Sequence, residues 1–272
     1  MTGIRLAGKA AREMGLATLL ISLGLCAFHV AIAFVLPFFA TEMIEQFLQV
    51  NFIQQIISAF LGVDPGAELG PGLINVMEWA HPLVLVLISA YAIMAGTRTP
   101  AGEVDRGTID VLLGLPIRRF TAYSAEAIVW SAGGLFLVGL GLVGHVIGRE
   151  IAEQEYGYGA TSLLLVNANL YCLFLAIAGI ASFFSTLCDR RGRAVGLSVA
   201  VLLTSFFISS FSSFHVVMKQ ISVISVMNYY RPFRVLQGNV PPLTDIVVLF
   251  AVGTVFWIIG GIIFTRRDIR TL

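Results

Sequence analysis

Polar side chains inside long apolar runs are the first candidates for chemistry in this sequence. Lipid makes such residues costly, so they usually bond neighbouring helices or mark a site or pathway. The set comprises His29, Glu126, Asn167 and Asn169, with His145 and His215 nearer the ends of runs. An enzyme acting inside the membrane would need a nucleophile with a base, or paired acids, on facing helices.

No local pattern such as GxSxG links these polar residues, and the three cysteines have no metal-ligand spacing. We therefore assign no catalytic and no metal-binding residue. Each isolated His or Asn is expected to bond another helix, and Glu126 lies near enough to a run's end to be solvated.

A second polar group lies in one segment, AGEVDRGTIDVLLGLPIRR at 101–119. Positions 98–119 hold seven charged residues in a chain of which only 12% is charged. Each charge at the centre of a bilayer helix costs roughly 2.5–3.5 kcal/mol, so we expect this segment in water. Its centre is nevertheless apolar. A helix over 108–115, capped by Thr108, would display Ile109, Leu112 and Leu113, which indicates a docking site for a partner.

Two glycine patterns imitate nucleotide-binding motifs. Gly102 and Gly107 have the spacing of a phosphate-binding loop, but Thr108 stands where that loop needs its lysine. The run GLGLVG at 139–144 matches a dinucleotide fingerprint, yet it lies inside an apolar run, where with Gly148 it favours close helix packing. We therefore expect no cofactor on this chain.

The composition indicates a membrane protein. The 272 residues are 57% hydrophobic and include 20 Phe. About 20 apolar residues of helix are needed to cross roughly 30 Å of hydrocarbon. Six runs qualify, although the second contains Pro82: 16–40, 77–97, 127–148, 162–188, 194–218 and 245–264. They are too continuous for a barrel, so we predict an all-α membrane protein with six transmembrane helices in a single domain, 1–272.

The basic residues predict the orientation, because Lys and Arg accumulate in short cytoplasmic loops. With both termini cytoplasmic, 13 of the 17 Lys and Arg residues fall inside, at 5–12, 98–119, 190–193 and 266–270. The outer segments hold only Arg149, Lys219, Arg231 and Arg234. The net charge of +1 gives no indication of a nucleic-acid partner.

Three connecting segments carry weaker patterns. The tail before position 16 favours a short helix on the inner membrane surface, or simply flanking positive charges. The outer segment 41–72 predicts an amphipathic helix that ends at the turn residues DPGAELGPG. The stretch 219–240 favours an interfacial or re-entrant segment with Tyr229, Tyr230 and Phe233 near the headgroups, a plain loop being the alternative.

The segment at 101–119 resembles a signature of the membrane subunits of ABC-2 type ABC transporters. In that family AGE, an acidic residue, GT, then LL and P with an Arg follow the second span. The sequence FTRRDI at 264–269 is similar to the family's usual finish to the sixth span. Two departures are Glu126, where the family often has Lys, and the extra charge of Arg106.

The resemblance implies a permease of the type V-like architecture in the inner cell membrane, forming a dimer with a second copy or a paralogue. ATP and Mg²⁺ would be bound by two cytoplasmic ATPase subunits, and this chain would catalyse nothing. Residues 98–119 would be the coupling segment seated on the ATPase, and 219–240 would be the outer re-entrant elements. The implied ATPase contacts are Glu103, Gly107, Thr108, Ile109, Leu112, Leu113, Pro116 and Arg118.

Three functions stay open at this point. The first is an ATP-driven transporter that exports an apolar or amphipathic compound. The second is a membrane receptor or scaffold that docks a cytoplasmic partner without transport. The third, ranked lowest, is an intramembrane enzyme. The sequence leaves the cargo undetermined among lipid, glycan, peptide and drug.

Overall fold

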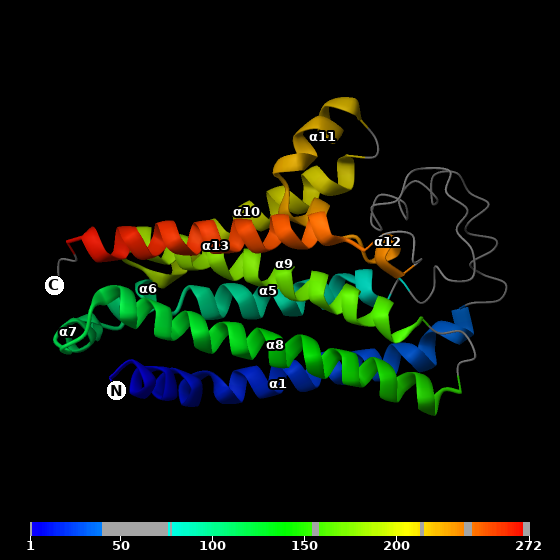
Figure 1. Ribbon diagram of the computed structural model, residues 1–272, viewed down its shortest axis with the longest axis horizontal. Helices are drawn as coiled ribbons and strands as arrows, with labels where there is room; N and C mark the ends of the chain where they lie inside the picture. Colours follow the sequence, from blue (N-terminus) through cyan, green and yellow to red (C-terminus); the bar gives the residue numbers. More distant parts are fainter. Residues whose placement is uncertain are drawn as a thin grey trace.

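The computed structural model describes residues 2–39, 76, 78–153, 158–212, 215–236 and 241–268. These ranges form helices and turns, with no strand among them. The long helices lie side by side in one bundle (Figure 1). The start of α1 and the end of α13 lie at the same end of it, together with α6 and α7 (Figure 1). We name this the terminal end, and the opposite one the far end.

The long helices account for most of the predicted spans. Five helices in the described ranges are long and apolar enough to cross a membrane: α1 (Thr2–Phe39), α8 (Arg119–Ile151), α9 (Ala160–Leu187), α10 (Arg191–Phe211) and α13 (Leu243–Arg266). The sixth, α5 (Pro82–Gly96), is apolar but has only 15 residues. Short helices complete the set: α6 (Ala101–Asp105), α7 (Ile109–Leu113), α11 (Val216–Ile221), η1 (Ser222–Ile224), η2 (Val226–Tyr229) and α12 (Pro232–Leu236).

The tail does not form a separate surface helix, so that interpretation is wrong and the alternative, positive charges that flank the first span, is favoured. α1 is one continuous helix of 38 residues, about 57 Å long at 1.5 Å per residue. No proline occurs before position 37 to interrupt it. Its first turns therefore extend beyond the roughly 30 Å of a hydrocarbon core.

The fifth predicted span ends earlier than expected. α10 stops at Phe211, and the short helices α11, η1, η2 and α12 follow, which favours a re-entrant segment over a plain loop. Tyr230 and Phe233 are buried in protein rather than placed at headgroups. The Tyr230 hydroxyl donates to the Trp79 carbonyl at 2.9 Å, because a buried phenol needs a partner. The amphipathic helix predicted at 41–72 lies outside the described residues.

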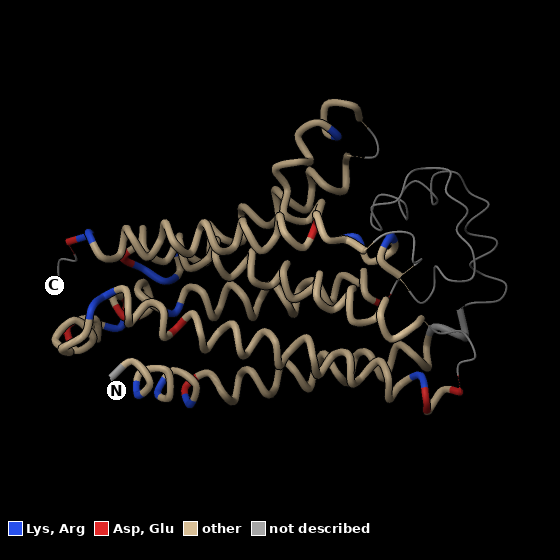
Figure 2. Tube along the Cα trace, in the orientation of Figure 1, with Lys and Arg blue, Asp and Glu red and all other residues tan. Residues whose placement is uncertain are grey.

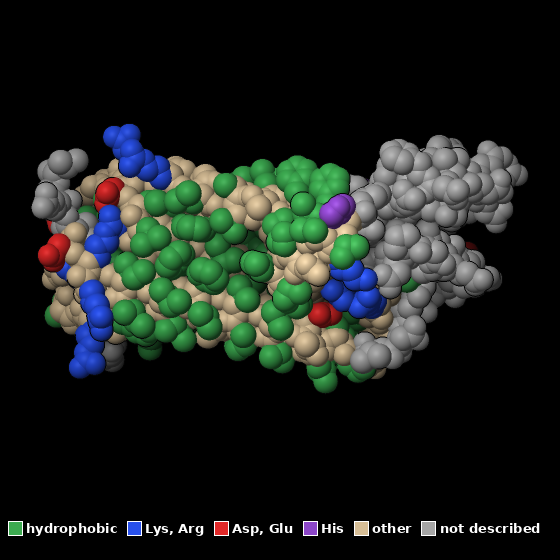
Figure 3. All heavy atoms as spheres, turned by 90° about the horizontal axis from the view of Figure 1, so that it is seen from above, with side chains coloured by type: hydrophobic (Ala, Val, Ile, Leu, Met, Phe, Trp, Pro, Cys, Tyr) green, Lys and Arg blue, Asp and Glu red, His purple; other side chains and the backbone are tan. Residues whose placement is uncertain are grey.

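Charged residues gather at the two ends of the bundle, as the tube view shows (Figure 2). Between them, one face of the molecule carries a broad band of hydrophobic side chains (Figure 3). This is the distribution that a bilayer requires of a membrane-spanning bundle.

Glycines bring the helices into close contact. A Cβ on Gly144 of α8 would lie 2.5 Å from the Cys26 carbonyl oxygen of α1, and one on Gly148 would lie 2.9 Å from the Ala33 Cβ. The prediction that the 139–148 glycines serve helix packing is confirmed for Gly141, Gly144 and Gly148 but not for Gly139, which has no neighbour within 4 Å. Gly179 of α9 and Gly253 of α13 form a second such contact, each against backbone of the other helix.

We predict opposite effects for two alanine substitutions in the same helix. Gly144→Ala should destabilise the protein by about 1–3 kcal/mol, because α1 must move away. Gly139→Ala should be neutral or stabilising, since a Cβ there meets nothing within 4 Å and alanine is the better helix former. Thermal unfolding of both variants in detergent measures this. Equal melting temperatures for the two variants would contradict the packing described.

Candidate functional site

The segment between α5 and α8 folds into two short helices at the terminal end of the bundle (Figure 1). α6 and α7 are joined by a turn in which Gly107 has φ of 69°. That left-handed conformation favours glycine, because an L side chain would clash there.

A buried arginine fixes the start of this segment. The Arg98 side chain is only 8% exposed, and its Nη1 donates to both carboxylate oxygens of Glu126, at 2.8 and 2.7 Å. Its Nη2 pairs with Glu13 of α1. The expectation that Glu126 is solvated is therefore wrong: the carboxylate neutralises Arg98, so that the pair joins α8 to the residue just after α5.

Hydrogen bonds attach α6 to α9 and the end of α5 to α10. The Ala101 amide of α6 donates to Ser185 Oγ at 3.0 Å, and Arg191 Nη2 of α10 donates to the Met94 carbonyl of α5 at 2.9 Å. Ala101 also packs against Cys188, in the loop between α9 and α10. Burial raises the pKa of the Cys188 thiol, which stays protonated and packs as a small apolar group.

Glu103 closes the turn between the two short helices. Its buried carboxylate accepts from Arg106 Nη2 at 2.6 Å and from the Thr108 hydroxyl. Thr108 is the N-cap residue of α7, as predicted, but its side chain makes no capping hydrogen bond. The carboxylate of Glu103 competes successfully for that hydroxyl, because hydrogen bonds to a charged acceptor are stronger.

α7 faces the bundle with the residues that were expected to face a partner. Ile109 is 2% exposed and packs against Tyr123 of α8 and Phe264 of α13, with Leu112 and Leu113 half-buried beside them. The expectation of a displayed Ile109 is wrong, because helical spacing cannot tell an inner from an outer partner. Val111, 71% exposed, is the apolar residue that α7 presents outward. Val111 was not among the predicted ATPase contacts; of those, Gly107, Thr108, Pro116 and Arg118 are exposed.

The two motifs quoted from the sequence meet at the terminal end. Arg267 of FTRRDI donates to the Thr186 carbonyl at 2.6 Å and pairs with Asp189, beyond α9. Arg119 in turn donates to the Arg267 carbonyl at 2.6 Å. The start of α8 and the end of α13 are thus fastened together.

Of the remaining polar candidates, His29 and His145 belong to one cluster, whereas Asn167, Asn169 and His215 do not. Asn169 Nδ2 donates to the Tyr229 carbonyl at 3.0 Å, and His215 caps α11 by accepting from the Val217 amide. Asn169 follows the expected role of bonding another helix, whereas His215 bonds only its own helix. The Asn167 amide is buried with no partner inside the described ranges. His29 and His145 both meet Glu78, which the sequence reasoning missed. The sequence signal that could have found it is an acidic residue at the start of a short apolar run, Glu78 in EWAHP.

Comparison with protein families identifies the chain. The model of the ABC-2 family transporter protein matches residues 12–269. The chain belongs to this family. Among curated proteins, none matches it. The protein is thus a multi-pass membrane component of an ATP-driven transporter, and the resemblance seen at 101–119 and 264–269 is confirmed. Subunits of this family lack ATPase activity and pair with separate ATPase subunits.

We predict that Arg98 is the main stabilising charge of this site. Arg98→Met should cost about 3 kcal/mol, because the Glu126 carboxylate, only 18% exposed, is left without its partner. Adding Glu126→Gln should recover most of that loss. Arg118→Met, which removes an exposed charge from the same segment, should cost less than about 0.5 kcal/mol. Thermal unfolding of the three variants tests this, and a double variant no more stable than Arg98→Met would refute it.

Proposed function

We propose that this chain is the permease subunit of an ATP-driven exporter and that the 98–119 segment is its contact with the ATPase subunit. The observation that carries the proposal is the division of α7 into two faces. Ile109 anchors the helix to α8 and α13, while Val111 stands exposed among charged residues at the terminal end. An anchored helix that leaves Val111 exposed beside Asp110 and Arg118 offers a second protein an apolar contact with charges that orient it.

The exposure of the individual side chains refines the predicted interface. Val111, Pro116 and Arg118 are exposed and can reach a partner, and Gly107 and Thr108 lie beside them in the turn. Glu103 and Ile109 are buried, so their role in the proposed interface is to hold it in shape. Charges such as Asp110 and Arg118 would orient the contact more than strengthen it.

We further propose six spans, with the terminal end in the cytoplasm. The charged residues on either side of α5 support this helix as part of the sixth span. Glu78 and Arg98 are 20 residues apart, which corresponds to about 30 Å if the segment between them is helical. The basic residues at 5–12, 98–119, 190–193 and 266–270 support the orientation.

The cargo that the spans favour is apolar or amphipathic, because few charges lie between the two ends of the bundle (Figure 2). A second copy or a paralogue would complete the transport path as a dimer. The alternative function is a scaffold that docks the same partner without moving a compound.

We predict that the two ends of the bundle label from opposite sides of the membrane. In a background with Cys26, Cys172 and Cys188 changed to alanine, Asp105→Cys should react with a membrane-impermeant maleimide only after permeabilisation. Ile151→Cys, at the end of α8, should react in intact cells. Both positions are exposed. Labelling of Asp105→Cys in intact cells would overturn the proposed orientation.

We predict that Val111→Asp abolishes co-purification of the ATPase subunit while the permease stays folded. A carboxylate there is solvated in the free permease but is buried without a partner in the complex. Val111→Ile should retain the ATPase, since it keeps the apolar contact. Retention of the ATPase by Val111→Asp would remove α7 from the interface.

A transport assay with the purified complex in lipid vesicles distinguishes an exporter from a scaffold. An exporter moves a lipophilic dye or lipid across the vesicle membrane only with ATP, and that movement disappears when the ATPase subunit cannot hydrolyse ATP. A complex that assembles but moves none of the tested compounds and shows ATP turnover independent of the permease would favour the scaffold.

A further inference from the structure

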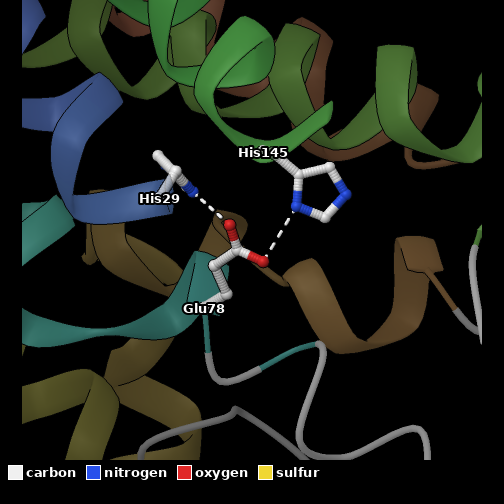
Figure 4. Close-up of side chains that lie close together, drawn as sticks. All are labelled: His29, Glu78 and His145. Carbon is white, nitrogen blue, oxygen red and sulfur yellow. Dashed lines mark hydrogen bonds and ion pairs between the residues drawn. The ribbon is translucent and has the colours of Figure 1, made fainter. Parts of the chain in front are cut away.

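Three buried side chains converge near the far end of the bundle (Figure 4). Glu78 lies just before α5, with one carboxylate oxygen 2.5 Å from His29 Nδ1 of α1 and the other 2.8 Å from His145 Nδ1 of α8. All three residues are buried. One donor atom from each lies within 4.8 Å of the others.

Hydrogen bonding alone leaves this cluster incompletely satisfied. Each imidazole uses Nδ1 toward Glu78, and Nε2 of both His29 and His145 is buried with no partner in the described part of the chain. Buried polar atoms without partners are uncommon in native proteins, and each is costly. A single amide is enough to bond two helical segments, as Asn169 does elsewhere in this bundle, and its burial costs less free energy than that of three ionisable groups.

The surrounding packing holds the three groups in place before any ligand arrives. The Trp79 ring lies against both imidazoles, with centroids 5.0 Å from His29 and 5.4 Å from His145. Tyr230 holds the Trp79 backbone through its hydrogen bond. α1 and α8 cannot easily separate here, since Gly148 sits against the His29 backbone. Fixed donors of this kind reduce the cost of binding an ion.

We propose that His29, Glu78 and His145 form a binding site for a divalent transition-metal ion of the Zn²⁺ class. Two imidazole nitrogens and one carboxylate oxygen make a donor set that such ions take, with a further position left for water. Mg²⁺ and Ca²⁺ are disfavoured, because they prefer oxygen ligands. For the two Nδ1 atoms to bind the ion, each imidazole would be neutral with its proton on Nε2, so the ion would take the place of both Nδ1–H groups that otherwise face Glu78.

The site would fasten three parts of the bundle at its far end. The ligands come from α1, from α8 and from the residues that lead into α5. An ion here would resist separation of these elements. The inference is independent of the ATPase contact, which lies at the other end of the molecule.

The test measures metal binding by the full-length chain in lipid nanodiscs, purified with a tag that contains no histidine. After removal of metals with a chelator, the wild type should take up one Zn²⁺ per chain by elemental analysis. Zn²⁺ should also raise its melting temperature. Co²⁺ as a second probe should give visible bands of nitrogen and oxygen ligation, with no sulfur-to-cobalt charge transfer from Cys26, one turn before His29.

Glu78→Gln and His145→Gln should each weaken Zn²⁺ binding by about 100-fold or more, since even outer partners of ligands are worth 10- to 100-fold. His215→Gln is the matched control, because it removes an exposed histidine far along the chain and should bind as the wild type does. If Glu78→Gln fails to fold, the Co²⁺ spectrum of the wild type still decides.

Three results would overturn the proposal. The first is a wild type that retains no more Zn²⁺ than Glu78→Gln, which would mean a hydrogen-bonded triad only. The second is equal weakening in His215→Gln, which would place binding elsewhere. The third is a cobalt spectrum dominated by sulfur ligation.

Discussion

α5 is held against the α1–α8 pair by a cluster of ionisable residues at each of its ends. Arg98, just after α5, pairs with Glu13 of α1 and Glu126 of α8. Glu78, just before α5, meets His29 of α1 and His145 of α8. A charge removed from water is costly unless a partner is supplied, so the same three elements must stay in register at both ends.

The packing of apolar residues between the two clusters depends on the same register of the helices. The Thr18 hydroxyl of α1 and the Tyr91 hydroxyl of α5 are 2.7 Å apart, and Tyr91 stacks on Phe174 of α9 with ring centroids 5.7 Å apart. Gly96 lets the end of α5 approach the α9 backbone, where a Cβ would lie 2.6 Å from the Ala178 carbonyl oxygen. α5 thus links the α1–α8 pair to α9, and these four helices form one closely packed unit.

Hydropathy was sufficient to predict the helical class, five long spans and the polar segment at 98–119, because lipid imposes length and apolarity on any spanning helix. The glycines of α8 were also predictable, since small residues at helical spacing permit close approach. The pairings were not: Arg98 with Glu126 and Glu78 with both histidines join residues 28 or more positions apart. Periodicity assigns a residue to a face, but only tertiary packing decides what that face meets. Ile109 shows this directly, because its spacing was correct and its partner was the bundle itself.

The contacts of the coupling segment favour movement as a rigid unit in the proposed transport cycle. α6 is bonded to Ser185 of α9, whereas α7 packs on Tyr123 of α8 and Phe264 of α13. If the Gly107 turn were free to bend, displacement of α7 by an ATPase would be absorbed there. Glu103 prevents that bending, because its carboxylate bonds Arg106 and Thr108 on either side of the turn. A displacement applied at Val111 would therefore reach α8 and α13 directly and reach α5 and α1 through Arg98, so the ATPase would act on both sides of the bundle at once.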